Sequence, residues 1–420
     1  MTVHALDPTV AVGRSTVDTG TAYGMPAGCF DDDLALVGPG TAMGEVFRRY
    51  WHAIARSDRV GTTPQTVRVL GENLVLFRDR GGVVGLLYPR CTHRGTSLLY
   101  AKVEDVGIRC CYHGWQFDAQ GFCVDQAAEP EGGRHKERYR QPWYPVREYH
   151  GLVFAYMGPP ERKPAFPIYD ELENLAPGEV LVTDDDSFGS GGAGVIDCNW
   201  LQHTENVLDP AHLPILHSMI SGPQFGAPVP ISATMTHPQY EFTDVGVISI
   251  SDREVAGGKV TRSIIEVCVP ALRLVPNPRR AIQDGVVDSD CDIFGWVTPV
   301  DDTHYQIFSI AKFPEGQDYG TSRTTMNGKP WAQLTPAEHR DFPGDYEAQT
   351  GQGPITLHSE EHLASTDRGV SMLRIFYRRQ IAAVRDGRDP AGVVVGPEFV
   401  NTRVHASRRA VMAGAQADPA

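Results

Sequence analysis

The spacing of apolar residues changes along the chain and divides it into regions of different secondary structure. Between residues 34 and 51, apolar side chains such as Met43 and Phe47 recur one helical turn apart, which predicts a short helix. From about residue 60 to 156, apolar and polar residues alternate, and turn signals such as residues 79–82 separate the runs. This second pattern predicts a small antiparallel β domain.

A proline-rich linker at residues 159–167 leads into a second unit. We expect a polar helix near residues 199–208 and a longer helix at about residues 355–384. Strand-like apolar runs lie between them, at residues 247–251, 263–269 and 306–311. Strands and helices mix without a regular βαβ order, so the predicted fold class is α+β.

These patterns divide the chain into four parts. We expect an N-terminal arm with a short helix, an all-β domain, an α+β domain and a flexible tail, with boundaries at residues 1–43, 44–158, 159–400 and 401–420. The chain of 420 residues is long enough for two domains, each with its own core.

Composition narrows the range of partners and compartments. Lys and Arg number 38 against 52 Asp and Glu, a net charge of −14, which argues against nucleic acid or an anionic membrane as the main partner. No apolar run approaches the roughly 18 residues of a membrane span, and the N-terminus does not resemble a secretory signal. We therefore expect a soluble cytoplasmic protein.

Eight cysteines are too few for a disulfide scaffold of this size, and in the cytoplasm they should be thiols or metal ligands. Five of them are scattered and are expected to be buried as small apolar residues. These are Cys29, Cys123, Cys198, Cys268 and Cys291.

The other cysteines form the strongest chemical signal. Cys91-x-His93 is followed, sixteen residues later, by Cys110-x-x-His113, and each half follows a β run in a loop that contains glycine. Two sulfur and two imidazole ligands fit either zinc or a Rieske [2Fe–2S] cluster. Each loop supplies one Cys and one His, an arrangement that favours the cluster over structural zinc. Cys111 competes with Cys110 by proximity, but only Cys110 keeps the two-residue interval to His113.

A second signal lies at the end of the predicted polar helix. In an α-helix, His212 and His217 would lie about 140° apart, too far for one metal ion. We expect Pro214 to break the helix and bend the chain so that both histidines reach one ion. Asp209, three residues before His212, can then accept that ligand's second N–H. Two histidines five residues apart are by themselves a weak signal, and a structural role is the alternative.

Two further motifs match known patterns without supporting context. The segment 189–194 fits G-x-G-x-x-G, but three aspartates precede it and no βαβ unit surrounds it, so a flexible loop is the better interpretation. His358, Glu361 and His362 fit the H-x-x-E-H metalloprotease pattern on the predicted long helix, where a solvated or interface face is the better interpretation.

Taken together, the two metal motifs resemble the large (α) subunit of Rieske non-haem iron aromatic-ring oxygenases. The likeness is to the phthalate dioxygenase-like branch, which includes oxygenases for phthalate, chlorobenzoates and phenoxybenzoate. It extends over about residues 34–385 and includes the segments 37–40, 48–51, 91–95, 110–117, 155–160 and 205–217. One departure is Cys111, where the family often has proline. The resemblance implies an all-β Rieske domain followed by an α+β catalytic domain with an antiparallel sheet and helices, in a helix-grip-like arrangement.

The resemblance also implies roles for individual residues. It assigns the Rieske cluster to Cys91, His93, Cys110 and His113, and two ligands of a mononuclear Fe(II) to His212 and His217. The branch usually places an aspartate eight residues before the glycine of a Gly-Pro-Ile segment.

In this chain Asp345 stands eight residues before Gly353 and is the expected third iron ligand, with Asp367 as the second choice. The resemblance makes Asp209 a bridge between the iron-bound histidine and a cluster histidine of the neighbouring subunit. That bridge requires a cyclic homotrimer or a stacked hexamer.

The implied activity is oxygenation of a small aromatic compound, an aromatic carboxylate such as a phthalate, chlorobenzoate or phenoxybenzoate. O2 is the co-substrate, and a separate reductase with flavin and ferredoxin-type centres supplies NAD(P)H electrons. An apolar substrate cavity is expected in the second domain. The alternatives are a monooxygenase or an O- or N-demethylase with the same ligands, and a Rieske electron carrier, which would need only about the first 160 residues and leaves the second motif unexplained.

Overall fold

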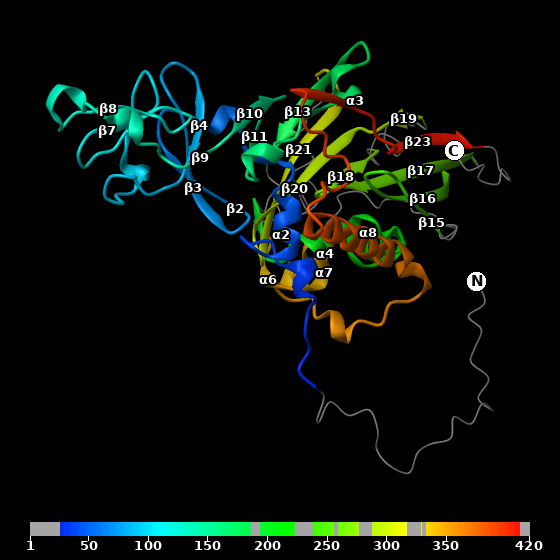
Figure 1. The fold of residues 1–420 in the computed structure, drawn as a ribbon. Helices are drawn as coiled ribbons and strands as arrows, with labels where there is room; N and C mark the ends of the chain where they lie inside the picture. The colour runs from blue at the N-terminus through cyan, green and yellow to red at the C-terminus, as the bar shows by residue number, and fades with distance from the viewer. Residues whose placement is uncertain are drawn as a thin grey trace, which may run out of the picture.

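The computed structural model describes residues 26–185, 194–222, 238–255, 259–276, 288–316, 329 and 333–411. Most of the expected N-terminal arm and the glycine-rich segment 189–193 lie outside the described residues. The chain as described forms a small β unit beside a large sheet with helices (Figure 1).

The first helical pattern forms two short helices, α1 (Asp32–Ala35) and α2 (Ala42–Phe47). The side chains of Asp31 and Thr41 cap them by accepting backbone N–H groups, which satisfies donors that a helix start leaves open. Met43 and Phe47 are fully buried, so the helical periodicity correctly identified the buried face.

The β unit consists of three antiparallel sheets, with strand orders β1-β11-β10, β2-β3-β4-β9 and β5-β6-β7-β8. The strands are β1 (Trp51–Arg56), β2 (Gln65–Val69), β3 (Glu72–Arg78), β4 (Val84–Leu87), β5 (Lys102–Val103), β6 (Ile108–Arg109), β7 (Trp115–Phe117), β8 (Cys123–Gln126), β9 (Trp143–Tyr144), β10 (Val146–Tyr149) and β11 (Leu152–Tyr156). The predicted antiparallel β domain is confirmed.

The second unit is built on a 10-stranded antiparallel sheet with the main order β13-β21-β20-β18-β17-β16-β15. Its strands are β13 (Glu179–Asp184), β14 (Val195–Ile196), β15 (Gln239–Phe242), β16 (Gly246–Val255), β17 (Lys259–Cys268), β18 (Leu272–Val275), β19 (Ser289–Asp290), β20 (Ile293–Asp301), β21 (His304–Pro314) and β23 (Ser407–Val411). A separate parallel pair joins β12 (Phe166–Tyr169) to β22 (Phe399–Thr402).

The helices of this unit are α3 (Asp170–Glu173), α4 (Trp200–Val207), a π-helix (Leu213–Ile220), α6 (Pro336–Asp341), α7 (Asp345–Thr350) and α8 (Arg368–Arg385). Helices α2, α4 and α8 gather on one side of the large sheet, as Figure 1 shows. The strands β1 and β11 pack through Trp51 and Phe154 onto its other side. The α+β prediction is therefore confirmed, with helices on one face of the sheet and strands of the β unit against part of the other.

Two predicted boundaries of secondary structure are wrong. The helix expected from about residue 355 begins only at Arg368, because Ala364 donates its backbone N–H to the Asp367 carboxylate, a local bond that starts a helix rather than continues one. The expected flexible tail includes β23, which pairs with β17; Arg408 in β23 is buried and donates to the Ser263 hydroxyl.

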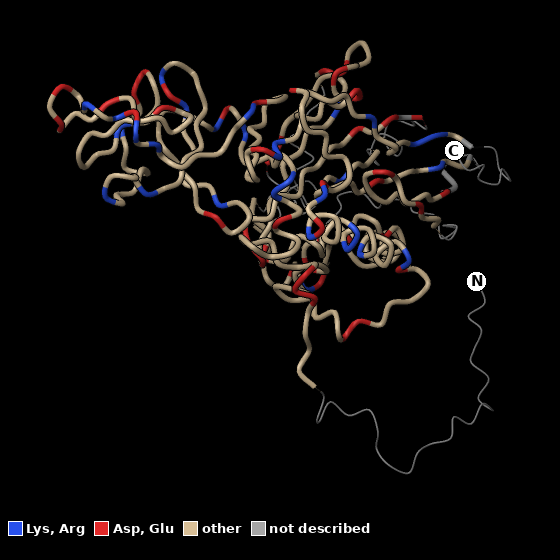
Figure 2. The backbone as a smooth tube through the Cα atoms, viewed as in Figure 1, with Lys and Arg blue, Asp and Glu red and all other residues tan. Residues whose placement is uncertain are grey.

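Lys and Arg (blue) and Asp and Glu (red) are interspersed over both units in Figure 2. Many form pairs, such as Arg78 with Glu148 at 2.6 Å. Of the five scattered cysteines, four are buried as predicted, whereas Cys29 is exposed. None of the described helices is long and apolar enough to cross a membrane.

Candidate metal centres

The two Cys/His loops share one backbone geometry. In each loop a glycine four residues after the cysteine donates its N–H to the cysteine carbonyl, Gly95 to Cys91 at 2.8 Å and Gly114 to Cys110 at 3.1 Å. Both glycines have a left-handed backbone, with φ of +76° and +71°, which a residue with a Cβ adopts only under strain. The glycines therefore permit two equivalent tight turns to face each other.

The four side chains of these loops converge. Cys91 and Cys110 are both 3% exposed, and the partly exposed rings of His93 and His113 lie 4.6 Å apart between centroids. Burial, together with the adjacent Cys110 thiol, raises the pKa of Cys91 to about 12. Two buried thiols this close are stable as thiolates only beside positive charge, which is the condition a metal cluster meets. Cys111 is exposed, unlike this buried pair.

The histidines of the second motif come together through a π-helix. His212 stands at its N-terminus and His217 lies inside it, and hydrogen bonds of a π-helix connect residues five apart, as from Ser221 N–H to the Leu216 carbonyl at 2.7 Å. Residues five apart therefore lie one above the other. The predicted bend at Pro214 is wrong: proline sits in the first turn of the helix, where a missing N–H costs little.

Asp345, at the start of α7, completes the group. Its two carboxylate oxygens lie 3.4 Å from Nε2 of His212 and 3.4 Å from Nε2 of His217. The candidate ligand atoms of these three residues all lie within 4.8 Å of one another, the sole group of this kind found among the described residues.

The electrostatics of the site favour a cation. Burial alone would raise the pKa of Asp345, but a hydrogen bond with His212 and the charge of His217 hold it well below its usual range. For His212 the effects are reversed. Burial alone would lower the pKa of this histidine, but the carboxylates of Asp209 and Asp345 outweigh burial and raise the pKa to about 9. Two imidazoles and a carboxylate held in this way have the composition of a facial iron site.

Comparison with known proteins identifies the family. Residues 50–164 match the Rieske [2Fe-2S] domain. The chain is 47% identical over 378 residues to the phenoxybenzoate dioxygenase subunit alpha of Ectopseudomonas oleovorans, covering 89% of this chain and 90% of that protein. The chain is a Rieske non-haem iron oxygenase α subunit.

A more distant relative of this Rieske oxygenase has a name that indicates a different kind of substrate. It is the tert-butanol monooxygenase / tert-amyl alcohol desaturase oxygenase subunit of Aquincola tertiaricarbonis, 34% identical over 417 residues, 93% of this chain and 85% of that protein. Among solved structures, dicamba monooxygenase bound to dicamba superposes with a TM-score of 0.54 at 16% identity, covering 81% of this chain and 99% of the other. That likeness supports the two-part fold.

The Rieske oxygenase therefore carries a Rieske [2Fe–2S] domain and a His-His-Asp mononuclear iron site. The sequence therefore predicted both cofactors correctly. Asp367, the second choice for the carboxylate, lies instead at the start of α8 and is outside the His-His-Asp group.

Asp209 and Asn206 flank the iron site. Asp209 is 26% exposed and its Oδ2 lies 3.6 Å from Nδ1 of His212, while its Oδ1 accepts the Ala211 N–H at 2.8 Å. Asn206 donates from its side-chain amide to Oδ1 of Asp345 at 3.3 Å. Asn206 holds the carboxylate from the side of α4, a contact that the sequence pattern does not reveal.

Two buried side chains support the cluster loops. The ring of Trp115 stacks on His93, with centroids 4.5 Å apart and planes within 2°. Gln141, fully buried, accepts the Thr92 N–H at 2.8 Å and donates to the Tyr88 carbonyl at 2.8 Å. Gln141 stands alone in the sequence with no motif around it, so sequence reasoning missed it.

The H-x-x-E-H motif is no metal site in this structure. His358 accepts the Asp31 N–H on its Nδ1 at 2.8 Å, and His362 is exposed. Glu361 pairs with Arg374, at 2.6 Å, so the predicted solvated or interface role is closer to the structure, although the motif does not lie on a long helix. Arg374 also pairs with the buried Glu205 of α4 at 2.6 Å and thereby ties α4 to α8.

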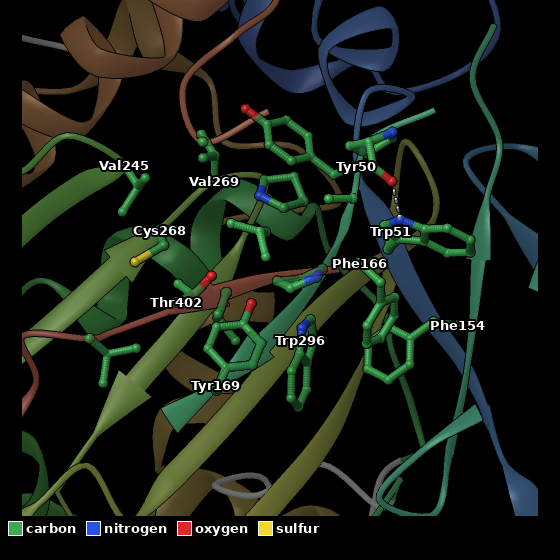
Figure 3. Close-up of a pocket in the computed structure, with 18 of the residues that line it drawn as sticks. Tyr50, Trp51, Phe154, Phe166, Tyr169, Val245, Cys268, Val269, Trp296 and Thr402 are labelled. Atoms are coloured by element: carbon green, nitrogen blue, oxygen red, sulfur yellow. Dashed lines mark hydrogen bonds between the residues drawn. The ribbon is translucent and has the colours of Figure 1, made fainter. Parts of the chain in front are cut away.

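An apolar cavity of about 90 Å³ lies between the β unit and the large sheet (Figure 3). Aromatic side chains from both units, among them Trp51, Phe166 and Trp296, line it. Side chains alternate along β18, so that Leu272 faces the cavity while Arg273 faces the helices and contacts His203 at 3.3 Å. None of the candidate iron ligands lines this cavity, and its lining includes residues of the β unit, so it is not identified with the substrate cavity expected in the second domain.

Proposed function

We propose that this protein is the oxygenase component of a multicomponent Rieske system that hydroxylates an aromatic carboxylate of the phenoxybenzoate type. The observation that carries the proposal is the 47% identity to a phenoxybenzoate dioxygenase α subunit over nine-tenths of both proteins. The monooxygenase relative at 34% identity is the basis of a second candidate, oxygenation or demethylation of another substrate with the same ligands.

In this proposal Cys91 and Cys110 hold one iron of the cluster, and His93 and His113 hold the other. The burial of both sulfurs and the partial exposure of both rings support this division, because the exposed imidazoles form the edge at which a partner can exchange electrons. Cys111 is exposed and takes no part.

The mononuclear Fe(II) is assigned to His212, His217 and Asp345. When bound, the cluster would store an electron and the Fe(II) would activate O2, leaving open positions for it. The protein supplies the orientation: the π-helix directs both Nε2 atoms to one point, and Asn206 holds the Asp345 carboxylate toward them.

Asp209 is assigned as the bridge between centres of neighbouring subunits. Its Oδ2 faces the Nδ1 of His212, opposite the Nε2 that faces Asp345, so it can orient the ring while the metal occupies the other nitrogen. Its 26% exposure leaves the carboxylate accessible to a histidine from another subunit. The assembly is then a cyclic homotrimer, or a stack of two.

The electrons come from a separate reductase that oxidises NAD(P)H, because the oxygenase component of a multicomponent system receives its electrons from another protein. A Rieske electron carrier, the competing class, needs only the cluster loops. The His-His-Asp group is without a purpose in such a carrier.

The experiment combines iron content with product analysis. The anaerobically reconstituted protein should hold three irons per chain, and with a reductase and 18O2 it should convert phenoxybenzoate to a product that contains 18O. Two irons per chain with no turnover would support the electron carrier instead. Turnover of tert-butanol or a methoxybenzoate, but not of phenoxybenzoate, would support the second candidate.

A further inference from the structure

A buried polar network lies behind the iron site and joins four elements of the catalytic unit. Its members are His203 of α4, Gln349 of α7, Tyr305 of β21 and Arg273 of β18, each no more than 6% exposed. Buried polar side chains are costly unless their hydrogen bonds are satisfied, so a network of this size needs a reason.

Gln349 is the centre of the network. Its Oε1 accepts the Tyr305 hydroxyl at 2.7 Å and contacts Nδ1 of His203 at 3.2 Å. Nε2 of His203 lies 3.3 Å from NH1 of Arg273. A guanidinium can only donate, so Nε2 accepts and the proton of the neutral ring is on Nδ1, from which it donates to Gln349.

These donors and acceptors allow a single arrangement of hydrogen bonds in the network. Arg273 donates to His203, and His203 and Tyr305 both donate to the amide oxygen of Gln349. An amide oxygen has two lone pairs, so both are used. Replacing this oxygen by an apolar group leaves two buried donors without their acceptor, which is the costly case for a hydrogen bond.

The network is connected to the iron carboxylate through one turn of helix. Gln349 stands four residues after Asp345 on α7, and side chains at this spacing lie on the same face. Gln202, which precedes His203 on α4, donates to the Gln349 carbonyl at 2.7 Å and so holds the other end of the short helix. Asn206, one turn further along α4, holds Asp345 itself.

We infer that Gln349 is a positioning residue for the mononuclear iron: its side-chain oxygen, held by Tyr305 and His203, sets the rotation of α7 and thereby the direction of the Asp345 carboxylate. Helix α7 has only six residues and could not hold this direction by its own hydrogen bonds. The inference rests on the proposed ligand role of Asp345 and adds the residue that aims it.

The test compares variants that keep or remove the acceptor oxygen. Protein with an intact cluster is stripped of mononuclear iron, and Fe(II) is titrated back anaerobically, with the EPR spectrum of the nitric oxide adduct as a second readout. Gln349→Leu should weaken Fe(II) binding by roughly 10- to 100-fold and change the rhombicity of the EPR signal. Gln349→Glu retains an acceptor oxygen and should bind Fe(II) within about threefold of the wild type.

A matched control comes from the same segment. Gln352 is exposed, three residues after Gln349, and Gln352→Leu makes the same chemical change outside the network, so it should leave Fe(II) binding unaltered. Wild-type affinity and an unchanged EPR signal in Gln349→Leu would overturn the inference. An equal loss in Gln349→Glu and Gln349→Leu would also overturn it, because Fe(II) binding would then not depend on whether the acceptor oxygen is kept.

If Gln349→Leu does not fold, Tyr305→Phe decides the question, since it removes only one donor. It should weaken Fe(II) binding by a smaller factor and shift the EPR signal in the same direction; no change in either would overturn the inference. The variant Asp345→Ala distinguishes failure of the positioning role of Gln349 from failure of the proposed iron site. If that variant retains iron, the ligand assignment fails; if it loses iron while Gln349→Leu retains it, only the positioning role fails.

Discussion

The two metal centres of this oxygenase are built in opposite ways. The cluster residues lie within one short stretch, in two turns of the same backbone geometry whose glycines and cysteine carbonyls close each loop locally. The iron residues come from a π-helix and from α7, which the intervening strands of the large sheet separate in sequence.

The difference shows where each centre is vulnerable. The cluster loops are closed mainly by contacts within each turn, such as the one from the Gly95 N–H to the Cys91 carbonyl. The iron site depends on contacts between distant elements, such as the Arg374 pairs with Glu205 and Glu361 that tie α4 to α8. A local centre should therefore fail through its ligands, and a non-local centre through its supports as well.

The largest effect is expected at the cluster. Cys110→Ala should abolish the [2Fe–2S] absorbance and EPR signal, because a buried thiolate cannot be replaced, while Fe(II) still binds at the separate iron site. Cys111→Ala, a change of the exposed neighbour, should retain the full spectrum. A cluster that survives in the first variant and disappears in the second would reverse the assignment.

The iron carboxylate comes next. Asp345→Ala should weaken Fe(II) binding by more than about 100-fold, beyond the range for supporting residues, with the cluster still reducible. Metal analysis after gel filtration and dithionite reduction measures both. Asp367→Ala is the control, because Asp367 lies at the start of α8, outside the His-His-Asp group; iron loss in that variant alone would identify it as the ligand.

Asp209 should affect the connection between the centres rather than either centre. Asp209→Ala is expected to retain both metals and the oligomer, yet to lower product formation in a single turnover by roughly 10- to 100-fold. The measurement is reoxidation of the reduced cluster after addition of substrate and O2. Reoxidation and product yield equal to the wild type would exclude the bridge, and loss of iron would make Asp209 a support for His212.

The smallest effect of a substitution is expected in the pH dependence of Fe(II) binding. In the metal-free protein the nearby carboxylates raise the pKa of His212 to about 9, and Fe(II) must displace its proton. Fe(II) affinity should therefore fall as the pH decreases below about 9, by roughly tenfold per pH unit. Asp209→Asn removes one of the raising carboxylates, so the decline should begin at a lower pH; anaerobic titrations from pH 6 to 9 would show equal curves if Asp209 has no influence.

The sequence predicted best what depends on neighbours along the chain. The alternation of residues identified the antiparallel β domain, and the Cys-x-His and Cys-x-x-His intervals identified residues that the structure brings together. That Asp345 lies close to the two histidines was predicted from a spacing typical of the family, and not from the properties of neighbouring residues.

What could not be predicted depends on contacts between distant segments. The periodicity before residue 368 suits a helix, but the bond from Ala364 to Asp367 competes with it. Strand β23 forms because β18 pairs with only part of β17, residues 266–268, and leaves residues 260–264 to pair with β23. The composition of the tail does not reveal this feature of the sheet. Gln349 and Arg374 carry no motif, since their importance arises only where α4, α7 and α8 meet.

The π-helix has a consequence for how such sites evolve. Two histidines on one face of an α-helix stand four residues apart, as in the zinc motif H-E-x-x-H, whereas here they stand five apart. A single inserted residue converts an ordinary helical turn into a wider one, and a single deletion converts it back. The number of residues between two metal ligands thus depends on the type of helix that carries them. Two sites with different intervals can therefore hold their ligands in the same arrangement.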